Sequence, residues 1–201
     1  MCIRGQVRDL GQNIQIQQQC RRALGKPLNG HPSSTGFGTK YSDPATLPTG
    51  LGSGLDITTT NTQLVASQGS VSPYVYAYDI SSSGFGSKYS NPSTLPTAAV
   101  GGITLNSNDT AVIVNQATTP IAYAWSGSGF GSKYSDPSTS TGTGPTQVSM
   151  FSNDSVVFCS WTGSSPYVRA YAWTNAGGWG SAYSDPSSLP VTAGYNVASY
   201  N

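Results

Sequence analysis

The nonapeptide GFGSKYSDP occupies residues 129–137, and the chain contains close copies of it three more times. These copies are GFGTKYSDP from Gly36, GFGSKYSNP from Gly84 and GWGSAYSDP from Gly178, so successive copies begin 48, 45 and 49 residues apart. A catalytic motif is normally present once, because one site needs one nucleophile or one base. A segment repeated at even spacing is typical of an architectural unit. The repeat therefore favours a structural role for this motif.

Each copy has the composition of a last strand followed by a turn. Its two glycines permit a sharp entry and a close backbone approach, and Asp-Pro or Asn-Pro ends the strand. Asn91 replaces aspartate before proline in the second copy, and asparagine cannot act as a general acid, so this position serves the turn. Asp109 and Asp154, in matching Asn-Asp turns, are interpreted in the same way. We expect two aromatic positions of each copy to pack against a sheet face: Phe37, Phe85, Phe130 and Trp179, and Tyr41, Tyr89, Tyr134 and Tyr183.

The sequence between copies predicts four short strands per unit. In the last unit these are Gln147–Phe151, Val156–Ser160, Tyr167–Trp173 and Trp179–Tyr183, with a tight turn at residues 152–154. The third strand alternates: Tyr167, Arg169, Tyr171 and Trp173 share one face, and Val168, Ala170 and Ala172 share the other. Tyr74–Tyr78 and Ile121–Trp125 are the corresponding third strands of the two preceding units.

These patterns predict an all-β fold, a β-propeller-like array of about three four-stranded antiparallel units with repeats of about 47 residues. The repeat domain would cover residues 35–201, with units at about 50–96, 97–142 and 143–190 and partial strands at 36–43 and 195–200. Since propellers close with about four to eight blades, three blades leave two open sheet edges. A second copy could complete a ring of six or seven blades, or the units could close as a β-trefoil; we favour the propeller.

Residues 1–34 do not repeat, and we interpret them as a basic arm and linker. The first 28 residues carry five basic side chains and one aspartate. Leu10 and Ile14 could line a weak helical face, with Arg21 and Arg22 near its C-terminal end, although the alternation NIQIQ also allows a strand. Two alternatives remain open: an assembly arm that orders against a neighbouring subunit, or a frayed terminus.

The composition favours assembly and disfavours catalysis. Only 8% of the residues are charged, which leaves little repulsion between copies. The chain has one histidine, His31, and no glutamate, and it shows no phosphate loop and no metal cluster, so we expect no enzyme activity, no cofactor and no metal. Cys159 lies in an apolar run and is expected to be a small buried residue.

Location and partners are predicted from the same features. The first residues lack the apolar region of a signal peptide, and no stretch approaches the length of a membrane helix, so we expect synthesis in the cytoplasm and no membrane partner. Nucleic acid is not an expected partner either, because the basic arm is short and residues 29–201 carry seven aspartates against four basic residues.

The elements SSPYVRAYAW and GWGSAYSDPSSLP, with FSND before them, resemble the WD40-like propeller repeats that are common in bacteriophage and phage-derived proteins. The resemblance covers roughly residues 35–199, and the chain departs from it in the degenerate first turn TTTNT and in the small number of units. It implies a propeller architecture and a non-enzymatic structural protein of a virion, as a tail or capsid decoration. Its partners would be further copies of the chain and other virion proteins.

A second function remains open, that of a carbohydrate-binding propeller lectin with a role in host adsorption. The GWG-AY wording loosely resembles small fungal and bacterial propeller lectins, in which several chains with few blades assemble a ring. Trp125, Arg169, Trp173 and Trp179 would then form sugar-stacking pockets between blades and bind a surface glycan. The alternative is that these aromatic residues belong to the core.

Overall fold

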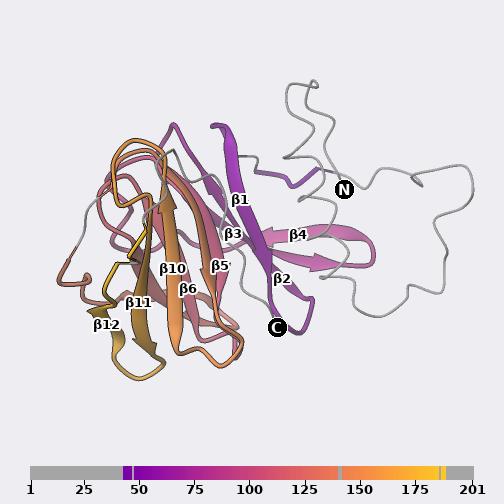
Figure 1. Cartoon of the computed structure of the whole chain (residues 1–201). Coiled ribbons are helices and arrows are strands. Elements are labelled where there is room, and N and C mark those ends of the chain that lie inside the picture. Colours follow the sequence, from indigo (N-terminus) through magenta and orange to yellow (C-terminus); the bar gives the residue numbers. More distant parts are fainter. Residues whose placement is uncertain (1–42, 47, 140–141, 186, 189–201) are drawn as a thin grey trace, which may run out of the picture.

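The computed structural model describes residues 43–46, 48–139, 142–185 and 187–188 (Figure 1). Within these ranges the chain forms twelve strands and no helix, so no described helix could cross a bilayer. The first sheet contains β1 (Gly52–Ile57), β2 (Gln63–Gln68), β3 (Val75–Ser81) and β4 (Gly84–Lys88). The second contains β5 (Val100–Leu105), β6 (Ala111–Gln116), β7 (Ile121–Ser126) and β8 (Gly129–Lys133). The third contains β9 (Pro145–Met150), β10 (Val156–Trp161), β11 (Val168–Thr174) and β12 (Gly178–Ala182).

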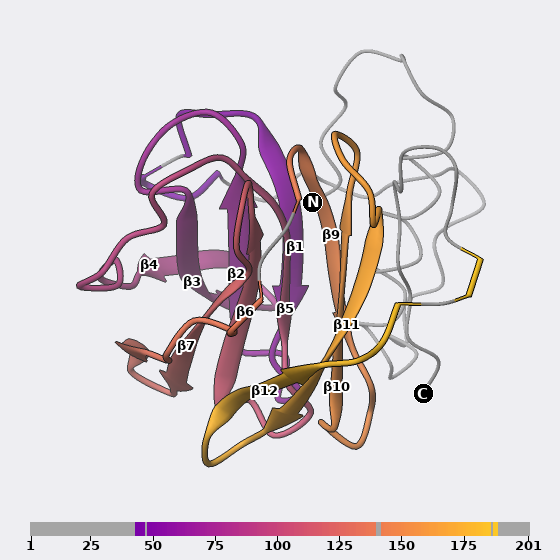
Figure 2. The same cartoon turned by 60° about the vertical axis from the view of Figure 1, so that its left-hand side comes forward.

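Each repeat forms one antiparallel sheet whose strands lie in sequence order. Figure 2 shows the three sheets side by side, with β1, β5 and β9 as neighbouring edge strands. The motif strands β4, β8 and β12 form the opposite edge of each sheet. This arrangement confirms the predicted all-β, propeller-like array. The β-trefoil alternative does not hold, because each unit keeps its four strands in a sheet of its own.

The core consists of two apolar layers, one at each junction between sheets. Val65, Val75 and Ala77 of the first sheet lie in one cluster with β5, β6 and β7. Ala111, Ile113 and Ala122 of the second sheet lie in a cluster with β9, β10 and β11. Opposite faces of one strand therefore serve opposite junctions, as the period of two predicts. Cys159 is fully buried in the second layer, and burial raises the pKa of its thiol well above the usual range.

The edge strands β1, β5 and β9 approach one another closely because glycines face the next strand. A Cβ on Gly102 would lie 2.6 Å from the Val148 amide nitrogen and 2.8 Å from the Gln147 Cα. A Cβ on Gly54 would lie 3.1 Å from the Ile103 amide nitrogen. Small residues are thus required here by backbone-to-backbone packing between sheets.

Several predictions concern residues outside the described ranges. These are the arm and linker 1–34, including Leu10, Ile14, Arg21 and Arg22, the partial strand 36–43 except Asp43, and the partial strand 195–200.

Candidate functional site

The repeated motif forms the joint between one sheet and the next. The ring of Tyr89, from the first sheet, lies edge-to-face on Trp125 of the second sheet, with centroids 5.7 Å apart. The ring of Tyr134 packs on Trp173 of the third sheet in the same way, at 5.4 Å. The sequence predicted packing against a sheet face. For these two tyrosines the face belongs to the following sheet, whereas the first aromatic position of the motif packs on its own sheet, as Phe130 does on Tyr123.

The first glycine of the following motif makes room for this tyrosine. A Cβ on Gly129 would lie 3.1 Å from Cδ1 of Tyr89, and a Cβ on Gly178 would lie 2.8 Å from Cδ1 of Tyr134. Both glycines also have a positive φ, +115° and +77°, which L side chains rarely adopt. Glycine is therefore needed here for two independent reasons.

The chain that follows the first and the third copy of the motif also contacts the next sheet, whereas the equivalent hydroxyl of Tyr123 has no hydrogen-bond partner among the described residues. Tyr78 of β3 donates a hydrogen bond to the carbonyl oxygen of Thr46 at 2.8 Å. Tyr171 of β11 donates the equivalent bond to the carbonyl oxygen of Thr139 at 3.0 Å. Both hydroxyls lie in a poorly hydrated environment, and burial raises the pKa of Tyr78 and of Tyr171 to about 12.

Asp154 links three loops at the junction between the second and third sheets. Its side chain is 5% exposed and accepts hydrogen bonds from the Ser107 amide at 2.8 Å, from Asn106 Nδ2 at 3.2 Å and from Asn175 Nδ2 at 3.1 Å. These partners come from the β5–β6 and β11–β12 loops. Asp154 has a φ of +54°, which aspartate tolerates better than most residues.

Asp109 is the equivalent aspartate at the first junction. It lies beside an open pocket, whereas Asp154 is surrounded by hydrogen-bond donors. Asp109, with a φ of +53°, accepts hydrogen bonds from the amide and hydroxyl of Thr59 through its Oδ2. Its Oδ1 is buried and has no hydrogen-bond partner among the described residues. Thr58 and Gly127 stand where the second junction has Asn106 and Asn175. The result is an open, polar pocket of about 330 Å³, lined by Thr58, Thr59, Thr60, Thr62, Gln63, Asn108, Asp109, Trp125 and Gly127.

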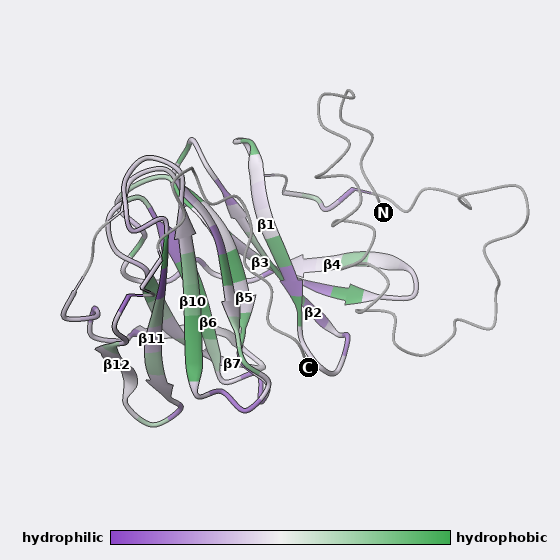
Figure 3. Cartoon of the chain, viewed as in Figure 1, coloured by the Kyte–Doolittle hydropathy of each residue, from purple (hydrophilic) through white to green (hydrophobic). Residues whose placement is uncertain are grey.

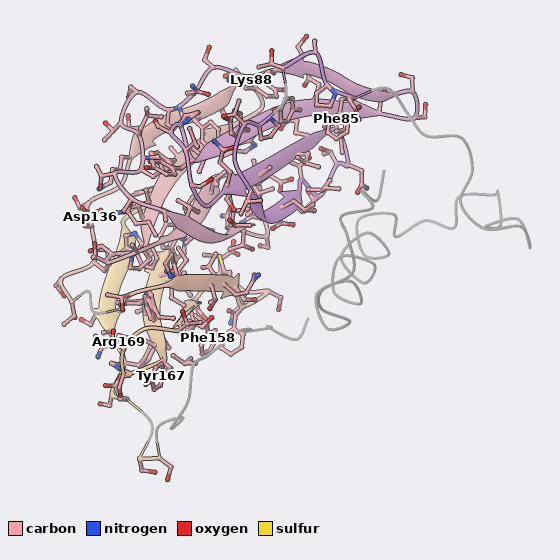
Figure 4. All side chains as sticks on the ribbon, turned by 90° about the horizontal axis from the view of Figure 1, so that it is seen from above. Phe85, Lys88, Asp136, Phe158, Tyr167 and Arg169 are labelled. Carbon is pink, nitrogen blue, oxygen red and sulfur yellow. The ribbon has the colours of Figure 1, made fainter. Side chains whose placement is uncertain are left out.

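The structure separates the four residues predicted to bind a ligand. Trp125 lies in β7 at the first junction, whereas Arg169, Trp173 and Trp179 belong to the third sheet. Trp125 and Trp173 are 5% and 3% exposed, so neither presents a free ring face for sugar stacking. Trp179 is half-buried and packs edge-to-face on Trp173 and Tyr171. Figure 4 places Arg169 near Tyr167 and Phe158, far from Phe85 and Lys88; its guanidinium pairs with Asp185 at 3.2 Å.

The described residues contain no group of three or more His, Cys, Asp or Glu side chains that could hold a metal ion.

The pKa of the Asp56 carboxyl is raised, mainly by burial. This carboxylate accepts hydrogen bonds from the Leu105 amide at 2.8 Å and from Thr104 Oγ1 at 3.1 Å. Asp56 therefore joins β1 to β5 across the first junction, which is a structural use of the carboxylate.

The pocket was not predicted from the sequence, although a signal for it exists. The turn after the first strand is TTTNT in the first unit, where the later units have NSNDT and FSNDS. From the sequence alone, this difference indicates only degeneracy of the repeat. In the structure, the turn of the first unit lacks the amide side chain that fills the second junction. The first junction is therefore left open.

No family model matches the chain, and no curated protein matches it. Solved structures of β-propeller proteins do match. A putative 6-phosphogluconolactonase from Bacteroides fragilis aligns with 62% of this chain at 12% identity and a TM-score of 0.52, and 35% of that protein is covered. A protein from Lactobacillus plantarum aligns with 72% of this chain at 15% identity and a TM-score of 0.55, with 42% of it covered. The chain thus spans about two-fifths of these proteins, and the likeness concerns the fold alone.

Proposed function

We propose that the chain is a non-enzymatic structural protein of a bacteriophage particle, with its propeller-like domain displayed on the virion and residues 1–34 docking it to neighbouring subunits. One observation carries this proposal: the repeated motif is engaged in packing. Tyr89 and Tyr134 join one sheet to the next. Lys133 pairs with Asp136 of its own copy, so the polar residues of the motif also stabilise the turn.

The resemblance of the repeats to those of phage proteins supports the virion context. The small number of ionisable side chains in the sequence supports the absence of catalysis. The name of the lactonase-like neighbour does not argue against this. At 12% identity, a shared propeller fold carries no activity from one protein to the other.

The proposal is tested on particles purified from a culture that produces the chain. Peptide mass spectrometry is expected to find the chain in many copies per particle. A variant lacking residues 1–28 should express and fold but be lost from the particles. Recovery of the full chain from the soluble fraction alone would contradict the virion role, and normal incorporation of the truncated variant would contradict the docking role of the arm.

The pocket beside Trp125 favours the carbohydrate-binding alternative over any other second function. Threonine hydroxyls and the Asn108 amide offer donors and acceptors of the kind that bind sugar hydroxyls, although stacking on Trp125 is blocked. A glycan array tests this function. Binding by the intact chain that is lost in Asp109→Ala and kept in Asn153→Ala, in the equivalent region of the next junction, would support it; an array without reproducible binding would exclude it.

A further inference from the structure

Each sheet has a forward face, which in the first two sheets contacts the next sheet, and a rear face, which in the last two contacts the preceding sheet. Strand pairing identifies equivalent positions on the forward faces. Val65 pairs with Ala77, Ile113 with Ala122, and Phe158 with Ala170. Val65, Ile113 and Phe158 are therefore the same position in three successive sheets.

The forward face of the third sheet is apolar and incompletely covered. Val65 and Ile113 have no exposed surface, whereas Phe158 is partly exposed. Phe158 packs against Phe151, with centroids 5.1 Å apart, and Phe151 is itself 38% exposed. Tyr183, which occupies the joint position of Tyr89 and Tyr134, is 51% exposed. Figure 3 shows that hydrophobic residues run along β10, the strand that carries Phe158.

The rear face of the first sheet is incompletely covered as well. Leu64 and Ala66 of β2 are partly exposed, whereas their equivalents are fully buried in the other two sheets: Val112 and Val114, and Val157 and Cys159. The rear faces of the second and third sheets are the surfaces that receive a forward face. One chain thus carries both halves of such a junction, one on the first sheet and the other on the third sheet.

The side-chain sizes of the two end faces compensate each other. At the first junction, Val65 lies in one cluster with Val112 and Val114. At the second, the larger Ile113 lies with Val157 and the smaller Cys159. Between two copies, the still larger Phe158 would face Leu64 and the smallest residue of the series, Ala66. Close packing requires this kind of trade between facing positions.

The edge strands indicate that a junction between copies would be wider than those within the chain. Gly54 and Gly102 allow close approach at the first two junctions, but the equivalent residue in β9 is Gln147. Its side chain would hold a further strand at a greater distance. A wider gap suits Phe158 and Phe151, which are bulkier than their counterparts on the first two forward faces.

We infer that the forward face of the third sheet docks on the rear face of the first sheet of a second copy. Two such contacts would give a ring of six sheets, within the range of about four to eight at which propellers close. This inference names the surface for the self-association that the proposed function assumes, and in that respect it rests on the proposed function. The test is made on the purified chain in solution. A chain that does not self-associate can therefore be distinguished from a chain that is absent from a virus particle.

The test compares the intact chain with single-sided variants by sedimentation velocity over a concentration series. Phe158→Asp blocks the forward face and Ala66→Asp blocks the rear face, because each would place an unpaired carboxylate in an apolar contact. The intact chain is expected to form a species of twice the 20.8 kDa chain mass. Each variant alone should associate about 100-fold more weakly or worse. The control Ser82→Asp, in the exposed β3–β4 loop, should behave like the intact chain.

Mixing the two variants decides the direction of the contact. Phe158→Asp keeps an intact rear face and Ala66→Asp an intact forward face, so their mixture should form a dimer through one contact. The recovery also shows that both variants are folded. An intact chain that stays monomeric, or a mixture that does not associate although the intact chain does, would overturn the inference.

Milder variants test the size compensation without a buried charge. Phe158→Ile leaves a void and Ala66→Val overpacks, so each should weaken association, and the double variant should recover part of the loss. If the losses of association in the two single variants simply add in the double variant, these residues do not contact each other.

Discussion

Gly102 lies where the second and third sheets approach each other closely, and it illustrates how a single atom decides the packing at the residue scale. An added Cβ would meet backbone atoms of β9, which cannot rotate away as a side chain can. Gly102→Ala is therefore expected to lower the free energy of unfolding by about 1–3 kcal/mol. Gly127→Ala is the matched control: its Cβ would meet nothing within 4 Å, and the change should stay within about 0.5 kcal/mol. Denaturant unfolding of both variants measures the difference, and equal stabilities would contradict the close approach.

The buried tyrosine hydroxyls predict how stability depends on pH. Burial raises the pKa of Tyr78 and of Tyr171 to about 12, above the value of about 10 for tyrosine in an unfolded chain. Between these values the unfolded chain loses protons that the folded chain keeps, so stability should be full below pH 10 and fall as the pH rises toward 12. Thermal unfolding measured across this range tests the expectation. A Tyr78→Phe, Tyr171→Phe double variant should show a flatter fall, and an unchanged slope would contradict the assignment.

At the scale of the strand, the sequence predicted the elements well and their partners poorly. The strands predicted at 147–151, 156–160, 167–173 and 179–183 correspond to β9, β10, β11 and β12 within one or two residues at each end. Alternation and turn residues specify a strand locally, which explains this agreement. The target of Tyr134 could not be predicted, because a tyrosine at the end of a strand suits its own sheet or the next equally well. The pocket depended on side chains from separate loops, which no local pattern brings together.

The loops that join strands differ in how strongly they connect sheets. Asp154 accepts bonds from Ser107, Asn106 and Asn175, whereas Asp109 accepts bonds from Thr59 alone among the described residues. Asp154→Ala should therefore lower the free energy of unfolding by about 2–3 kcal/mol, because several donors lose their acceptor. Asp109→Ala, at the equivalent position, should cost less. Asp154→Asn keeps an acceptor and tolerates the positive φ, so its effect should be intermediate; equal losses for the two alanine variants would contradict the difference between junctions.

On the scale of the whole molecule, the three sheets hold together by a contact that is repeated and directional. Tyr89 and Tyr134 point forward, and each is received by a glycine and a tryptophan of the next sheet. Sequential contacts of this kind make stability a sum of sheet and junction contributions, as in other repeat proteins. The end surfaces then combine the apolar character of a junction with incomplete burial, which is the basis of the proposed contact between copies.

The motif tyrosines therefore allow folding and assembly to be separated by one pair of variants. Tyr134→Ala removes a ring packed on Trp173 and Gly178, and it should lower the free energy of unfolding by about 2 kcal/mol. Tyr183→Ala changes the same motif position where the ring is 51% exposed, so the monomer should lose no more than about 0.5 kcal/mol. If Tyr183 meets the first sheet of a second copy, this second variant should instead weaken association. Unfolding curves at low concentration and sedimentation at high concentration measure the two effects; a Tyr183→Ala variant that destabilises the monomer as much as Tyr134→Ala does would show that Tyr183 already has its partner within the chain.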